Sequence, residues 1–427
     1  MEIKRTYQQL KNVYHLIKAV AANFYYLFPS KKICIIAVTG TNGKTSTVWM
    51  VNKILEEAGC KTAVSSTINF KIGSKEWVNK TKFTTRSSWE IQKFINKAVQ
   101  QKCRYLVMEV SSHSLDQNRV WGTSFNAAVL TNITREHLDY HRTMREYEKA
   151  KAKLFQMTAK NFGSGVINMN NKINEPQRFL SRDMNKYFFY GREKGANFWP
   201  EANNGELVIA NNVSIGKSST KFKVDDQAFH LSLPGEINLE NALASICVAK
   251  LLQLPLEKAS RALSKMKLIP GRMEKVENKK GVGIIIDYAL TPDSMERLGK
   301  TYVADDGKNL IWVFGSCGER DRGKRPIMGE IASKYADKII LTNEDPYNEN
   351  PSRIVDEIKE GIKGKAEGEG FWVVMDRQEA IKKALSIAKK GDIVLITGKG
   401  AEENMMIKGK KIPWSDKKTV QEALQNL

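Results

Sequence analysis

The sequence has no uninterrupted apolar run near the ~20 residues that a membrane-spanning helix needs, and no secretory leader is apparent at its start. Cysteine is also scarce, with five residues in 427, and none of them form a CxxC pair. An odd number of scattered cysteines argues against a disulfide framework and favours buried thiols in a reducing compartment. We therefore expect a cytoplasmic protein without a transmembrane segment.

Acidic residues are outnumbered, since 47 Asp and Glu stand against 68 Lys and Arg, giving a net charge of +21. Such an excess can mark a surface that binds polyanions, or it can reflect lysine-rich solvated faces. The lysines are spread along the chain rather than packed into one tract. We expect no dedicated nucleic-acid site, although a P-loop ATPase that binds nucleic acid remains an alternative from a different functional class.

The clearest motif is a phosphate-binding turn near the N-terminus. An apolar run, Ile33 to Val38, reads as a buried strand, and Gly40-Thr41-Asn42-Gly43 then leads into a helix that begins with Lys44-Thr45. Backbone N–H groups of such a turn and the helix dipole face an anion, while the lysine reaches phosphates and the threonine hydroxyl reaches Mg²⁺. The generic P-loop has a glycine where Val38 stands, so this is a variant P-loop. We interpret the chain as ATP-binding.

Two further polar groups follow strands and suggest a metal. Glu109 ends the apolar strand that starts at Tyr105, at the position where a P-loop enzyme needs a Mg²⁺ ligand. His137 and His141 are four residues apart, a spacing that zinc sites also use, but no third ligand with suitable spacing follows. The sequence therefore favours magnesium over zinc.

Alternating strands and helices predict an α/β protein of two or three domains. We expect an N-terminal amphipathic helix over 1–31, a central P-loop ATPase domain with a mainly parallel sheet over 32–269, and a C-terminal doubly wound, Rossmann-like α/β domain over 270–427. A β-rich excursion is expected within 160–232. The C-terminal strands are predicted at Val282 to Asp287, Leu310 to Phe314, Lys338 to Thr342, Phe371 to Met375 and Ile393 to Thr397.

The N-terminal helix has an apolar face that could serve two purposes. Apolar residues recur at spacings of three and four from Tyr7 to Phe28, namely Leu10, Val13, Ile17, Val20, Phe24 and Leu27. This face could pack onto the next domain or adsorb to a membrane surface. We expect packing, because the helix is short of Lys and Arg on its polar face and leads directly into the P-loop strand.

Eight segments, taken together and in order, resemble the Mur ligase family of ATP-dependent amide-forming enzymes, and within it the branch that adds the third residue of the peptidoglycan stem peptide. The segments are Thr39-Gly-Thr-Asn-Gly-Lys-Thr45, Glu109-Val-Ser-Ser-His113, Thr131-Asn-Ile-Thr-Arg-Glu-His-Leu-Asp-Tyr-His141, Tyr147-Glu-Lys-Ala-Lys151, Gly235-Glu-Ile-Asn-Leu-Glu-Asn-Ala-Leu243, Gly271-Arg-Met-Glu274, Asp287-Tyr-Ala-Leu-Thr-Pro-Asp293 and Asp321-Arg-Gly-Lys-Arg-Pro326.

The resemblance implies a monomeric ligase that uses ATP and Mg²⁺ to join an amino acid to a UDP-MurNAc-peptide-like precursor. It implies ATP contacts by Gly40, Thr41, Asn42, Gly43, Lys44, Thr45, Asn238, Asn241, Arg272 and Asp287. It implies metal ligation by Thr45, Glu109, His137 and a carbamylated Lys151, with Lys44, Lys151 and His137 as the catalytic group. It implies precursor contacts by Thr84, Thr85, Ser111, Gln117 and Arg119, and an amino-acid pocket formed by Arg320, Tyr347, Gly398 and Glu402.

Three departures from the family pattern bear on the substrate. Only about 35 residues precede the P-loop strand, fewer than the ~50 of a small domain, so we expect a truncated uridine-binding region. Leu290 and Ala401 stand where the family has histidines. Glu344-Asp-Pro-Tyr347 stands where the diaminopimelate-adding branch has Asp-Asn-Pro-Arg, and its negative charge predicts a preference for lysine or ornithine. A Mur-like ligase of a folate or a poly-amino acid remains an alternative.

Overall fold

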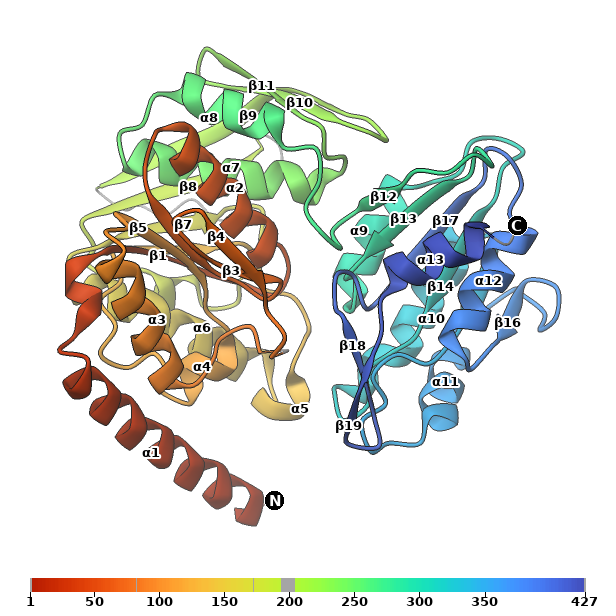
Figure 1. The fold of residues 1–427 in the computed structure, drawn as a ribbon, viewed down its shortest axis with the longest axis horizontal. Coiled ribbons are helices and arrows are strands. Elements are labelled where there is room, and N and C mark those ends of the chain that lie inside the picture. Colours follow the sequence, from red (N-terminus) through yellow and green to blue (C-terminus); the bar gives the residue numbers. More distant parts are fainter. Residues whose placement is uncertain (1, 82, 172, 193–203, 426–427) are drawn as a thin grey trace.

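The computed structural model describes residues 2–81, 83–171, 173–192 and 204–425, with side chains from residue 8 onward. Figure 1 shows two α/β bodies beside one another, the first red to green and the second green to blue. Each is built on its own large sheet, and the chain passes from one to the other after helix α8 (Leu256–Lys265). Within the described ranges, no helix is both long and apolar enough to cross a membrane.

The first sheet has the strand order β11-β10-β9-β8-β7-β6-β1-β5-β2-β3-β4. Strands β9 to β6, β1, β5 and β2 run parallel to their neighbours, while β10, β11, β3 and β4 add antiparallel edges. Their bounds are β1 (Cys34–Thr39), β2 (Thr62–Ser65), β3 (Asn69–Ile72), β4 (Lys75–Val78), β5 (Tyr105–Glu109), β6 (Ala127–Leu130), β7 (Ser164–Asn168), β8 (Lys186–Arg192), β9 (Gly205–Ile215), β10 (Thr220–Val224) and β11 (Gln227–Leu231).

Helices cover both faces of this sheet because successive β1 side chains point to opposite sides. Ile36 and Val38 belong to a core that includes α2 (Lys44–Glu57), α7 (Glu236–Leu251) and α8. Ile35 and Ala37 belong to the opposite core. That core includes α3 (Ser88–Gln100), α4 (Ser112–Asp116) and α6 (Met144–Ala159), and the short α5 (Leu138–His141) lies at its edge (Figure 1).

The predicted β-rich stretch exists, but it is not a separate excursion. Strands β7, β8 and β9 continue the parallel sheet from β6, and only β10 and β11 turn back. The prediction was wrong on this point because the region is polar in sequence, whereas β7 and β8 are almost entirely buried. The β3–β4 hairpin was not predicted.

The second sheet has the order β12-β13-β17-β14-β15-β16, and only β12 is antiparallel. All five predicted C-terminal strands are confirmed, whereas β12 and the β18–β19 hairpin were not predicted. The strands are β12 (Glu274–Val276), β13 (Gly283–Asp287), β14 (Leu310–Phe314), β15 (Lys338–Leu341), β16 (Phe371–Val373), β17 (Ile393–Thr397), β18 (Asn404–Ile407) and β19 (Lys410–Pro413). One face carries α9 (Pro292–Thr301), α10 (Arg325–Tyr335) and α11 (Pro351–Lys359), and the other carries α12 (Arg377–Ile387) and α13 (Asp416–Gln425).

Helix α1 (Glu2–Tyr25) is present, but it packs with the opposite face from the one expected. Most of the predicted packing face is exposed to solvent, with exposed fractions of 64% at Leu10, 62% at Ile17 and 62% at Phe24. The side chains turned toward the protein are instead small or polar, including Ala19 and Asn23. The helix therefore packs on the following domain as expected, but the prediction of the face that it uses was wrong.

Candidate active site

The P-loop is held in shape by the strand beside it. The backbone N–H of Thr41 donates to the Asn132 carbonyl at 2.8 Å, and the N–H of Asn42 donates to the Asn132 side chain at 2.8 Å. Gly43 has φ +81°, and a Cβ there would lie 2.2 Å from the side chain of Asn241. Glycine is therefore required at the end of the turn, where the backbone passes against helix α7.

Two lysine side chains converge on one carbonyl oxygen of the turn. Lys44 Nζ donates to the Gly40 carbonyl at 2.9 Å and to the Thr41 carbonyl at 2.8 Å. Lys151 Nζ, from α6, donates to the same Gly40 carbonyl at 2.8 Å. Burial lowers the pKa of both ammonium groups. At Lys151 the pKa falls well below its usual value, because the Lys44 charge adds to desolvation.

A hydroxyl and a carboxylate meet beside these lysines. Thr45 Oγ1 donates to Glu109 Oε1 at 2.8 Å, and Thr67 donates its N–H and its hydroxyl to the same carboxylate at 2.8 and 2.9 Å. These are the hard oxygen donors that Mg²⁺ prefers. The described residues contain no cluster of three or more His, Cys, Asp or Glu able to hold a metal. The donors therefore fit a magnesium that takes part of its coordination from phosphate oxygens and water.

His137 lies at the N-terminus of α5 with φ +57°, a left-handed conformation that is uncommon for a residue with a side chain. Its ring stands 4.6 Å from the His113 ring, and burial holds its pKa well below the usual range. Among the described residues its Nδ1 has no hydrogen-bond partner. A neutral, buried imidazole with an unpaired nitrogen is suited to accept a bond from a metal or its water.

The predicted nucleotide residues come from both bodies. Asn238 and Asn241 lie on α7; the Asn241 side chain accepts a hydrogen bond from Thr47 at 3.3 Å. From the second body, Arg272 Nη2 donates to Thr45 Oγ1 at 3.2 Å. Asp287 accepts the Met273 N–H at 2.7 Å, and burial raises its pKa. The second body therefore reaches directly over the P-loop.

Three of the predicted precursor residues form one hydrogen-bond network, and a fourth, Gln117, bonds elsewhere; none of the four lines the cavity. Thr85 Oγ1 accepts the Ser111 N–H at 2.9 Å, and Arg119 donates to the Thr85 carbonyl at 2.5 Å. Gln117 donates to the Tyr140 hydroxyl at 3.4 Å. Thr84 instead lies in the cavity wall, where it accepts a hydrogen bond from Thr67 at 3.1 Å.

In the predicted amino-acid pocket, charge is largely balanced. Lys399 Nζ contacts the two Asp345 oxygens at 3.1 and 3.0 Å and Glu402 at 2.5 Å. Glu344 is buried, which raises its pKa, and it accepts a hydrogen bond from Cys317. The pairing of Asp345 with Lys399 removes part of the electrostatic argument for lysine or ornithine, and the choice of amino acid stays a prediction.

The pocket's shape depends on two strained positions. A Cβ on Gly398, where φ is +111°, would lie 2.3 Å from Glu344 Oε2. Tyr347 also has a positive φ, +52°, and is tied to the β18–β19 hairpin by its N–H to the Met406 carbonyl at 3.2 Å. The Arg320 guanidinium lies 5.6 Å from the centre of the Tyr347 ring. Arg320 therefore holds an available positive charge over an aromatic face.

One cavity between the bodies joins most of these groups. The predicted residues that line it are Thr41, Asn42, Gly43, Lys44, Thr45, Thr84, Glu109, His137, Asn238, Asn241, Arg272, Asp287, Arg320, Tyr347 and Glu402. Gly40, Thr85, Ser111, Gln117, Arg119, Lys151 and Gly398 do not line it and lie behind its wall. The structure therefore places the P-loop residues and three residues of the predicted amino-acid pocket, Arg320, Tyr347 and Glu402, around one cavity.

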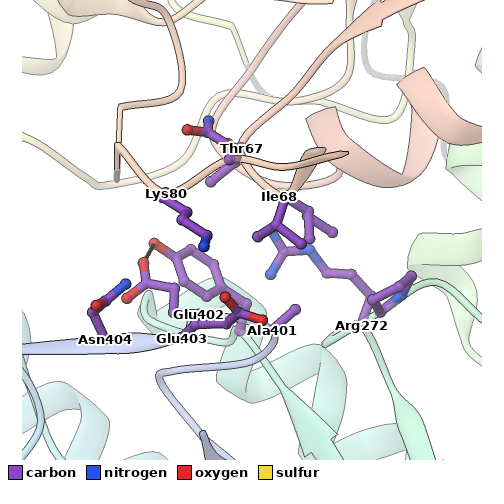
Figure 2. Close-up of a pocket in the computed structure, with 12 residues that line it drawn as sticks. Thr67, Ile68, Lys80, Arg272, Ala401, Glu402, Glu403 and Asn404 are labelled. Carbon is purple, nitrogen blue, oxygen red and sulfur yellow. Dashed lines mark hydrogen bonds between the residues drawn. The ribbon is translucent and has the colours of Figure 1, made fainter. Parts of the chain in front are cut away.

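A smaller pocket adjoins this cavity and is shown in Figure 2. Thr67, Ile68 and Lys80 lie on one side of it, and the segment from Ala401 to Asn404 lies on the other. Arg272 and Glu402 border both pockets, and the Tyr288 hydroxyl donates to Glu402 at 2.9 Å. The two pockets therefore share part of their walls at the joint between the bodies.

Sequence reasoning missed several residues of the cavity. Lys324 Nζ contacts the Glu136 carboxylate at 3.1 and 3.3 Å, a buried ion pair that links the two bodies. Glu136 lies in the motif from Thr131 to His141, and Lys324 lies in the motif from Asp321 to Pro326. Neither motif indicated that the two residues form an ion pair. Thr67, which donates twice to Glu109, lies in no motif, and only the fold could have identified it.

Comparisons with known proteins agree with this arrangement. Residues 38–249 match the model of the Mur ligase middle domain, and residues 271–400 match that of the Mur ligase glutamate ligase domain. A similar curated protein is the UDP-N-acetylmuramoyl-L-alanyl-D-glutamate–2,6-diaminopimelate ligase of Caldanaerobacter subterraneus. It is 39% identical over 409 residues, which cover 95% of this chain and 80% of the relative.

Solved structures give the same picture. A structure of a UDP-N-acetylmuramoyl-L-alanyl-D-glutamate–2,6-diaminopimelate ligase superposes with a TM-score of 0.59 at 30% identity, covering 92% of this chain and 78% of that one. The folylpolyglutamate synthase of Mycobacterium tuberculosis superposes with a TM-score of 0.68 at 15% identity, covering 91% and 93%. At that identity the second likeness shows a shared fold alone.

Proposed function

The chain belongs to the Mur ligase family, and from that premise we propose that it joins an amino acid to a UDP-MurNAc-dipeptide-like peptidoglycan precursor at the expense of ATP. The observation that carries the proposal is the single cavity that holds the P-loop residues Lys44 and Thr45 together with Arg320 and Tyr347. Phosphoryl transfer and amine attack need their reactants within one enclosed space, and this cavity supplies it.

The reaction requires activation, because a carboxylate is a poor electrophile. The precursor carboxylate takes the terminal phosphoryl group of ATP to give an acyl phosphate, and the amine of the incoming amino acid then displaces phosphate through a tetrahedral intermediate. Lys44 from the P-loop and Arg272 from the second body are placed to neutralise the phosphoryl oxygens. Thr45 and Glu109 would hold Mg²⁺, which would supply further neutralisation of phosphate charge.

Lys151 is proposed to act after carbamylation, which converts an ammonium into a carboxylate-like group. Addition to CO₂ needs the neutral amine, and burial together with the Lys44 charge lowers the Lys151 pKa in that direction. The Lys151 amine lies at the Gly40 carbonyl, in the inner wall of the P-loop. A carbamate there would complement the Lys44 charge instead of opposing it.

For the amino acid we propose diaminopimelate, with lysine as the competitor. The proposal is supported by the names of the similar proteins, which are diaminopimelate ligases. Diaminopimelate carries a second carboxylate, and Arg320 offers a charge for a carboxylate in a pocket whose own acids are balanced or buried. Tyr347 replaces the arginine of the branch's motif, so Arg320 bears more of this recognition.

The test is phosphate release with Mg²⁺-ATP and UDP-MurNAc-L-Ala-D-Glu across a panel of amino acids, with mass analysis of the product. We expect release that depends on both the dipeptide precursor and a diamino acid, and highest kcat/KM with diaminopimelate. Single-stranded DNA is added in a parallel reaction without precursor. Phosphate release stimulated by DNA alone would overturn the proposal.

A further inference from the structure

Helix α1 exposes its large apolar side chains and packs on the protein mainly through small and polar ones, including the buried Ala19, Ala22 and Asn23. Leu10, Val13, Tyr14, Ile17, Phe24 and Tyr25 are all more than half exposed, and their spacing of three, four and seven places them along one stripe. We refer to these six residues as the α1 stripe. Figure 1 shows α1 at the periphery of the first body, outside the layer that contains α3 and α4.

The polar side of the helix is fixed to the protein by specific hydrogen bonds. Gln8 donates to the Tyr140 hydroxyl at 2.8 Å, Asn12 donates to Asp116 at 3.2 Å, and Asn23 donates to the Trp121 carbonyl at 2.7 Å. These contacts determine the rotation of the helix about its axis. The α1 stripe is therefore held outward by the fold and is not a packing surface of the described chain.

Beyond Glu2, the charged residues of helix α1 and of the segment that follows it are all basic. From residue 3 to residue 55 the sequence contains no Asp or Glu, while Lys4, Arg5, Lys11, Lys18, Lys31 and Lys32 lie in or directly after the helix. Lys18 lies over the Tyr14 ring at 4.4 Å, next to the stripe. A second copy of this helix would bring like charges together, whereas an anionic surface would be attracted.

Aromatic residues complete the pattern. Tyr25 of the stripe contacts the half-exposed ring of Trp89 on α3, with ring centres 4.9 Å apart. Trp121, beside the C-terminal end of α1, is 38% exposed. Tyrosine and tryptophan rings favour the boundary between lipid headgroups and acyl chains, and basic residues beside them favour anionic headgroups.

We propose that the α1 stripe binds the surface of an anionic lipid bilayer, with α1 lying parallel to the membrane plane. The six apolar and aromatic side chains enter the headgroup boundary, and the neighbouring lysines face lipid phosphates. The inference goes beyond the proposed ligase function and does not depend on it, because the stripe contains no residue of the cavity.

The experiment is co-sedimentation of the full chain with vesicles of phosphatidylcholine alone or with about 40% phosphatidylglycerol. We expect binding to the anionic vesicles that weakens as NaCl is raised. The variant Leu10→Gln, Ile17→Gln, Phe24→Gln should lower the bound fraction by about tenfold or more, because each change removes an apolar group from the boundary. The matched control is Phe162→Gln, Leu268→Gln, Val303→Gln, which alters three exposed apolar residues elsewhere and should bind as the parent does.

Two readouts keep the result unambiguous. Phosphate release without vesicles should be equal in the stripe variant and the parent, which shows that the variant is folded and leaves the ligase proposal untouched. Sedimentation velocity without lipid tests the rival occupant, a second copy of the chain. Vesicle binding that is unchanged in the stripe variant, or a dimer that the variant abolishes while vesicles bind neither protein, would overturn the proposal.

Discussion

At the P-loop end of the cavity, Lys44 and Lys151 place two amines on a single backbone carbonyl, and no carboxylate of the described residues is in direct contact with either. At the far end, the Lys399 amine forms ion pairs with the carboxylates of Asp345 and Glu402, so its charge is neutralised by side chains. The first arrangement leaves cationic capacity for a phosphate that arrives with the substrate. In the second arrangement the lysine and the carboxylates neutralise one another, so these residues can shape a pocket without supplying charge to it.

The strongest test of this contrast is Lys44→Ala. We expect phosphate release to fall by about a hundred- to thousandfold, because the transferring phosphoryl group loses its main side-chain cation. The control is Lys53→Ala on the same helix, whose amine pairs with Glu56 at the surface. Near-normal turnover in Lys44→Ala would show that this end of the cavity does not hold the phosphates.

Lys151→Ala should cost about a hundredfold in turnover, since it removes a group that supports the bound metal. Short carboxylates added to the buffer should restore part of the activity if the parent lysine is carbamylated. Lys149→Ala, two residues away on the exposed face of α6, serves as the control. An unimpaired Lys151→Ala enzyme would show that this lysine has only a structural role.

Arg320→Met should affect binding of the amino acid at the far end of the cavity and leave ATP binding unchanged. We expect the KM of the amino acid to rise about tenfold or more, because a charged hydrogen bond to a carboxylate is lost, while the KM of ATP stays the same. Arg353→Met, on α11, is the matched control. A parallel rise in both KM values would mean that the two ends are not separable.

Tyr347→Arg gives the smallest expected effect. The substitution restores the arginine fork of the branch's motif, and we expect kcat/KM for diaminopimelate to rise about fivefold relative to lysine. Tyr347→Phe controls for loss of the hydroxyl. A shift toward lysine would indicate that the new guanidinium pairs with Asp345 or Glu344 instead of the substrate.

The sequence predicted the P-loop end well, because short-range motifs dictate its geometry. A strand, a glycine turn and a helix are contiguous, so Gly43 and Lys44 could be placed without knowing the fold. The charge balance at the far end of the cavity depends on residues that are far apart in the chain. Asp345 and Lys399 are 54 positions apart, and no local pattern shows that the lysine cancels the charge of the aspartate.

The same limit explains the error on α1. Periodicity identified the helix and its apolar face, but it could not tell which face would meet the protein. That choice was made by Tyr140, Asp116 and Trp121, which offer acceptors to polar residues of the helix. Periodicity measures how residues share a face, and only the partner surface decides whether that face is buried.

The contact between the P-loop and the second body has a consequence for the pace of turnover. Asn42 Nδ2 donates to Thr291 at 3.2 Å and to Asp293 at 2.9 Å, and Arg272 closes over Thr45. A nucleotide bound in the turn would lie beneath these contacts, so we expect ADP to leave after the bodies part. We expect the steady-state rate to fall as glycerol or sucrose raises the viscosity of the solvent, because the separation of two bodies of this size displaces solvent.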